Sequence, residues 1–120
     1  MANQFGIPEI EPATLAEKRA AGGSFRIVDV RELHELTMAN LEEGDDLVHM
    51  PLSELAQRYE DAIPEAIQDK HAELIIFCHH GGRSAQVCAY LKSQGWTNVL
   101  NLRGGIHAYA VEVDASVGVY

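Results

Sequence analysis

The stretch LIIFCHHGGRS, at residues 74–84, decides the fold of this 120-residue chain. Its first five residues are apolar, which is typical of a strand covered on both faces of a parallel sheet. A polar loop with two glycines follows, and from Ser84 onward the apolar residues recur at helical spacing. The sequence therefore places Cys78 at the carboxyl end of a buried strand, where open α/β sheets build their sites.

Short apolar runs alternate with amphipathic stretches along the rest of the chain, which predicts an α/β domain. We expect strands at 9–10, 25–30, 47–50, 74–78 and 99–102, and helices at 12–21, 53–59, 84–94 and 106–113. This order predicts a mainly parallel five-stranded sheet with helices on both faces. No repeat or Pro/Gly-rich linker divides the sequence, so we expect a single domain over residues 1–120.

Composition narrows the class of protein. The chain is 47% hydrophobic and 22% charged, with a net charge of -9, which is the balance of a globular protein with an acidic surface. Such a surface repels phosphate backbones and anionic lipids, so we expect no nucleic-acid and no membrane partner. Residues 1–11 lack the pattern of a secretory signal, and two cysteines are too few for a disulfide framework. These features favour a cytoplasmic location.

The loop after the central strand has the composition of an anion cradle. Gly81 and Gly82 allow the backbone to curl, so that successive N–H groups converge on one point. The helix that follows directs its positive end to the same point. A cysteine placed there has its thiolate, or the outer sulfur of a persulfide, stabilised by these groups.

The loop from Cys78 to Ser84 resembles the active-site loop of single-domain rhodaneses. Three further motifs resemble that family in the expected order: VDVRE at 28–32, HMPL at 49–52, and NLRGGI at 101–106 with Tyr109. The similarity spans about residues 7–120. One departure is the segment at 40–46, which is longer and more acidic than the compact turn of many relatives.

The resemblance implies a three-layer rhodanese-like fold and a sulfurtransferase activity without a cofactor. Sulfane sulfur would pass from thiosulfate or a persulfide donor to a thiophilic acceptor through a persulfide on Cys78. Arg83 would frame the loop and attract anionic donors, although a purely structural role is the alternative. Asp29 and Arg31 would support the loop from beneath as an internal ion pair. The implied substrate- and persulfide-binding loop comprises His79, His80, Gly81, Gly82, Arg83 and Ser84.

The segment from Gly104 to Tyr120 resembles rhodanese domains fused to adenylating enzymes of sulfur-carrier pathways. That similarity implies small sulfur donors and thiol acceptors as substrates. It also suggests a sulfur-carrier, desulfurase or adenylating protein as a partner.

Three other functions are weighed against sulfur transfer. Cysteine phosphatases of related architecture have five residues between cysteine and arginine, whereas four separate Cys78 from Arg83. A redox enzyme is disfavoured because the CxxC pattern is missing. A non-catalytic rhodanese module that only binds a partner is disfavoured by the intact cysteine loop. Cys88 lies on the apolar side of a predicted helix, where packing is the expected role.

Metal binding is also disfavoured by the sequence. His79 and His80 adjoin Cys78, but adjacent residues rarely point at one centre, and no second Cys/His cluster completes a tetrahedral site. We therefore expect no metal and place both rings at the rim of the site, where partial positive charge assists anion capture. The acidic run at 42–46 lacks the spacing of a calcium loop and is predicted to be a solvated turn.

Overall fold

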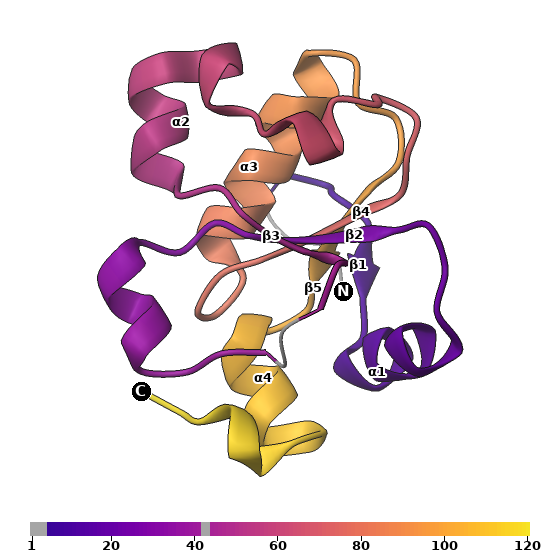
Figure 1. Cartoon of the computed structure of the whole chain (residues 1–120), viewed down its shortest axis with the longest axis vertical. Coiled ribbons are helices and arrows are strands. Elements are labelled where there is room, and N and C mark those ends of the chain that lie inside the picture. The colour runs from indigo at the N-terminus through magenta and orange to yellow at the C-terminus, as the bar shows by residue number, and fades with distance from the viewer. Residues whose placement is uncertain (1–4, 42–43) are drawn as a thin grey trace.

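A parallel β-sheet forms the middle layer of the computed structural model, which describes residues 5–41 and 44–120 (Figure 1). Its five strands lie in the order β1-β5-β4-β2-β3, and every neighbouring pair is parallel. The strands are β1 (Glu9–Ile10), β2 (Arg26–Asp29), β3 (Leu47–His49), β4 (Leu74–Phe77) and β5 (Val99–Leu102). The predicted five-stranded sheet is confirmed.

Helices cover both faces of this sheet, as predicted (Figure 1). The α-helices are α1 (Pro12–Ala21), α2 (Leu52–Arg58), α3 (Gly82–Ser93) and α4 (Gly105–Glu112). The described chain also contains the short 3-10 helices η1 (Leu33–Thr37), η2 (Tyr59–Ala62), η3 (Glu65–Ile67) and η4 (Ala115–Val117), which we did not predict. Helix α3 begins two residues earlier than expected, because Gly81 takes a left-handed φ of 108° and ends the loop there.

The side chains of the central strand β4 are buried on both faces of the sheet. Alternate side chains of a strand point to opposite faces. Leu74 and Ile76 pack into a core with residues of α2 and α3, whereas Ile75 and Phe77 pack into a second core with residues of α1 and α4. All four β4 residues are buried, so the strand has no solvent-facing side.

Helix α4 is held against the Cys78 loop at the carboxyl edge of the sheet. Ile106 N–H donates to the carbonyl of Cys78 at 2.9 Å, and His107 N–H donates to the carbonyl of His79 at 3.1 Å. Gly105 makes this approach possible, since a Cβ there would lie 2.5 Å from the His79 carbonyl oxygen and 2.6 Å from that of Cys78. Its φ of +64° also disfavours any other residue.

Gly105→Ala should therefore separate α4 from the loop. We expect a loss of about 2–4 kcal/mol in the free energy of unfolding, from the clash with backbone and the left-handed φ. Gly82→Ala is the matched control, because a Cβ at Gly82 meets nothing within 4 Å. Urea denaturation of both variants measures the difference. Equal stability of the two variants would contradict the close approach.

The acidic segment at 40–46 is held to helix α1 at its end. Arg19 of α1 makes a bidentate ion pair with Asp46, at 2.9 and 3.0 Å, and this contact lowers the pKa of Asp46. The segment is therefore anchored to α1 at its end. Positions 42 and 43 lie outside the described residues, so the prediction of a solvated turn stays untested there.

None of the helices in the described ranges is long and apolar enough to cross a bilayer.

Candidate active site

Cys78 directly follows β4 and lies at the start of the loop that leads into α3. Its Sγ accepts a hydrogen bond from Gly81 N–H at 3.1 Å. The hydroxyl of Ser84, in the first turn of α3, is 3.4 Å from the same sulfur. Cys78 is only 1% exposed, so its sulfur is enclosed by the loop. The sulfur thus has backbone and hydroxyl donors and the N-terminus of a 12-residue helix beside it.

A buried hydrogen-bond network supports this sulfur from below. Asn101, at 1% exposure, donates from Nδ2 to the Gly81 carbonyl at 3.1 Å and to Glu9 at 2.8 Å. Its Oδ1 accepts from the Ser84 hydroxyl. The Ser84 hydroxyl also lies 3.3 Å from the Gly81 carbonyl. A hydroxyl has one hydrogen, so Ser84 donates to only one of Asn101, the Gly81 carbonyl and Cys78 Sγ at any moment. Ser84 is therefore able to turn its hydrogen toward a charged sulfur when one forms.

Cys88 lies in a different environment, on the side of α3 that faces the apolar core. The residue is fully buried beside Val87 and Leu91. Burial raises the pKa of its thiol to about 12, so the thiol stays protonated and unreactive. Both cysteines are free thiols. These contacts agree with the predicted packing role of Cys88.

Arg83 points its guanidinium at Glu35, a residue of η1 that we did not single out from the sequence. Nη1 and Nη2 each lie 2.7 Å from one oxygen of the carboxylate. Glu35 also accepts from Glu32 N–H at 2.8 Å and from the Tyr120 hydroxyl at 2.9 Å. The bond from Arg83 holds the pKa of Glu35 at about 2 and raises the pKa of Arg83. The predicted anion-attracting cation is thus already paired.

Asp29 and Arg31 form the internal ion pair that the resemblance implied. Arg31 is fully buried, and its Nε and Nη2 lie 3.0 and 2.8 Å from the two carboxylate oxygens of Asp29. Its guanidinium sits 5.6 Å from the centre of the Phe77 ring, directly before Cys78 in the chain. Arg31 also donates to the Glu35 carbonyl at 3.3 Å. The pair therefore fixes η1, and with it Glu35, beside the loop.

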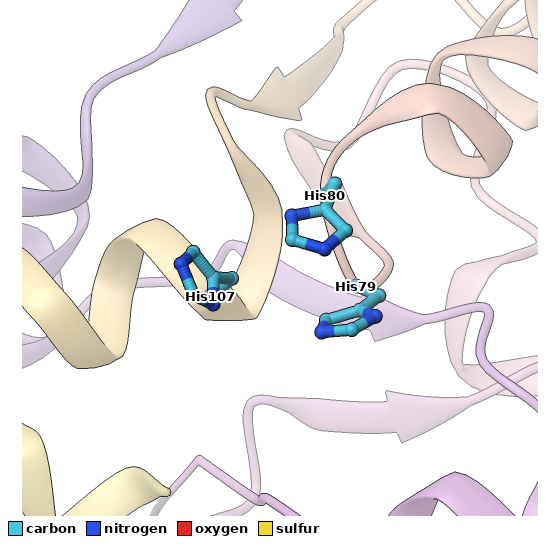
Figure 2. Close-up of side chains that lie close together, drawn as sticks. All are labelled: His79, His80 and His107. Atoms are coloured by element: carbon cyan, nitrogen blue, oxygen red, sulfur yellow. The ribbon is translucent and has the colours of Figure 1, made fainter. Parts of the chain in front are cut away.

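Aromatic rings gather where the loop meets α4 (Figure 2). The His79 ring stacks on Tyr120 with centroids 3.7 Å apart. The His80 ring is tilted by 32° against His79, with centroids 3.9 Å apart. His107 of α4 approaches both imidazoles. Burial lowers the pKa of His79, and the neighbouring His80 lowers it further. His79 therefore carries less positive charge near neutral pH than we predicted for anion capture.

Known proteins identify the family to which the fold belongs. Residues 11–112 match the rhodanese-like domain family. The chain belongs to this family. A sulfurtransferase of Allochromatium vinosum is 35% identical over 104 residues, which cover 87% of this chain and 89% of that protein. The crystal structure of a rhodanese-like domain protein from Staphylococcus aureus matches with a TM-score of 0.69 at 26% identity, over 86% of this chain and 91% of the other.

Rhodanese-like domains similar to this one also occur inside larger proteins. A maize adenylyltransferase and sulfurtransferase is 26% identical over 117 residues, which cover 95% of this chain but only 24% of that protein. The predicted similarity to domains fused to adenylating enzymes is therefore confirmed. Sulfur transfer is accordingly the general activity of the family to which this rhodanese-like domain belongs.

Four residues of this rhodanese-like domain's site were missed as site residues. Asn101 was noted only as part of a family motif, and its position on β5 beside β4 was the available signal. Glu35 had no signal in the sequence, and His107 and Tyr120 were noted only as part of the segment at 104–120 that resembles other rhodanese domains. The structure brings all four against the loop from Cys78 to Ser84.

Proposed function

We propose that this domain moves sulfane sulfur from thiosulfate or a persulfide donor to a thiophilic acceptor through a persulfide on Cys78. The observation that carries the proposal is the hydrogen bond from Gly81 N–H to Cys78 Sγ inside a loop with four residues between cysteine and arginine. Such a loop is sized for one added sulfur atom. Fully buried Cys88, with its raised pKa, leaves Cys78 as the nucleophile.

The proposed reaction has two nucleophilic steps. The Cys78 thiolate attacks the outer sulfur of thiosulfate, the sulfur–sulfur bond of thiosulfate breaks, and sulfite leaves with the electron pair. The loop N–H groups then face the negative outer sulfur of the Cys78 persulfide. An acceptor thiolate or cyanide attacks that outer sulfur, and Cys78 leaves as the thiolate. No metal or redox cofactor enters either step.

We infer a place for this reaction in sulfur supply to a carrier or thiolation pathway in the cytoplasm. The similarity to a domain of an adenylyltransferase and sulfurtransferase supports this class of partner. Two free thiols without a disulfide suit a reducing compartment. A sulfur-carrier, a desulfurase or an adenylating protein would then supply or receive the sulfur.

Intact-mass spectrometry tests the proposal directly. Brief exposure to thiosulfate should add the mass of one sulfur atom to the wild-type chain and to Cys88→Ser, but not to Cys78→Ser. Cyanide should remove the added mass and release thiocyanate. A wild-type chain that gains no sulfur from thiosulfate or from a low-molecular-weight persulfide would instead indicate a non-catalytic binding module.

A further inference from the structure

Three imidazoles converge at the rim of the Cys78 loop. His79 and His80 come from the loop and His107 comes from the first turn of α4, and Figure 2 shows their rings around a common space. One nitrogen from each ring can be chosen so that all three lie within 4.8 Å of one another. From the sequence we disfavoured a metal, because adjacent histidines rarely point at one centre and no second Cys/His cluster completed a site. The rings of His79 and His80 lie 3.9 Å apart, and His107 supplies the further ligand that the sequence did not show.

Two nitrogens of this three-histidine cluster are left unsatisfied by the protein. His79 Nε2 and His107 Nδ1 are buried and have no hydrogen-bond partner among the described residues. A buried polar atom without a partner costs free energy, and an ion or water at the site is a common explanation. His79 also has a hydrogen bond to the Tyr120 backbone, so its partnerless Nε2 is the ring nitrogen left for a ligand. A neutral imidazole carries a lone pair on the nitrogen without a hydrogen, so His79 Nε2 and His107 Nδ1 can each bind an ion in the matching tautomer.

We propose that His79, His80 and His107 bind a divalent transition-metal ion of the zinc class at the rim of the Cys78 loop. Neutral imidazole is a preferred ligand of zinc, copper and nickel, and three imidazoles with one open position is a known zinc arrangement. This site goes beyond the sulfur transfer proposed above and does not depend on it.

The three ligand nitrogens must come closer together to bind an ion. In a tetrahedral site with zinc–nitrogen bonds of about 2.0–2.1 Å, ligand nitrogens lie roughly 3.4 Å apart. The present limit is 4.8 Å, so the rings must turn about their side-chain bonds to close on an ion, and His79 must do so beside the Tyr120 ring on which it stacks. The backbone is already fixed, because His107 N–H donates to the His79 carbonyl at 3.1 Å. An ion bound there would join the loop to α4.

Metal titration of the untagged full chain tests the site. We expect the apo protein to bind one Zn²⁺ per chain in competition with a chromophoric chelator, and to show a higher midpoint of thermal unfolding with Zn²⁺. His107→Asn should weaken the affinity by about tenfold or more. His71→Asn is the matched control, because His71 is exposed, contacts Thr97 and lies outside the cluster.

Cobalt(II) distinguishes this site from binding by the cysteine. With three imidazole ligands, Co²⁺ should give visible d–d bands without a thiolate-to-cobalt charge-transfer band, and Cys78→Ser should retain the binding. Zinc affinity that is unchanged in His107→Asn would overturn the proposal, and so would absence of stoichiometric binding. Loss of binding in Cys78→Ser with a thiolate band in the wild type would assign the metal to the sulfur instead. None of these readouts depends on sulfur transfer.

Discussion

Cys78→Ser will abolish thiocyanate formation from thiosulfate and cyanide, whereas Cys88→Ser will keep most of it. Serine offers a hydroxyl that forms no persulfide, so the covalent intermediate is lost. We expect the rate to fall by about 10³-fold or more, as when the nucleophile of other covalent enzymes is removed. The Gly81 N–H group that donates to the sulfur remains in place in this variant.

The second cysteine makes a demanding control for this result. Cys88 is on the same helix-and-loop segment, yet it lies in the apolar core and its pKa is raised to about 12. In Cys88→Ser the new hydroxyl can donate a hydrogen bond to a backbone carbonyl in the preceding turn of the helix, which limits the loss of stability. Cys88→Ala provides a second variant without a buried hydroxyl. Full turnover by Cys78→Ser, with circular dichroism showing a folded chain, would contradict the assignment of Cys78 as the nucleophile.

The fold was predictable because its signals are local. The apolar run at 74–77 and the glycines after it determine a buried strand, a tight loop and a helix start without help from the rest of the chain. Pro12 and the pair Gly22–Gly23 likewise mark both ends of α1. Helix bounds differed by one or two residues, as at α3, where the left-handed Gly81 moved the start of the helix.

The surroundings of the sulfur were less predictable because they depend on tertiary contacts. Glu35 looks like an ordinary acidic residue in the sequence, and its role arises from a short 3-10 helix that carries it to Arg83. His107 follows Gly105, whose close approach to the loop becomes visible only when α4 packs against it. Glu35 and His107 lie far in the sequence from the loop residues they contact, so no periodic pattern in the sequence reveals these contacts.

The ion pair between Arg83 and Glu35 changes the expected behaviour of Arg83. The resemblance to rhodaneses implied that Arg83 attracts anionic donors, so that Arg83→Ala would harm thiosulfate use more than use of a neutral or protein-bound persulfide. Both terminal nitrogens of Arg83 are instead bonded to the Glu35 carboxylate. We now expect Arg83→Ala to lower the second-order rate constants for both donors alike, since the variant disturbs the start of α3.

Stability should fall together with activity in Arg83→Ala. The Glu35 side chain is only 9% exposed, so removing its partner leaves a nearly buried carboxylate without its strongest donor. We expect a loss of about 2–3 kcal/mol in the free energy of unfolding. The loss is smaller than for a fully buried pair, because the Arg83 side chain is 34% exposed and water screens part of the interaction. Urea denaturation at neutral pH measures this change.

The pH dependence identifies Glu35 as the source of that stability. Its pKa is lowered from 4.5 to about 2 in the folded chain, first by the bond from Arg83. A depressed folded pKa stabilises the fold above pH 4.5, and this contribution is lost as the pH falls from 4.5 toward 2. Arg83→Ala and Glu35→Gln should both flatten this part of the stability profile.

Glu35→Gln then separates structure from donor selection. Glutamine keeps the shape and an acceptor for Arg83 but removes the negative charge, so Arg83 becomes an uncompensated cation at the loop. The rate constant for thiosulfate, a dianion, should rise several-fold relative to that for a neutral persulfide, and added salt should reduce the gain. Comparison of both donors in Arg83→Ala and Glu35→Gln is decisive. If Arg83→Ala impairs thiosulfate selectively and Glu35→Gln leaves the donor ratio unchanged, Arg83 meets the anion directly despite its pairing with Glu35.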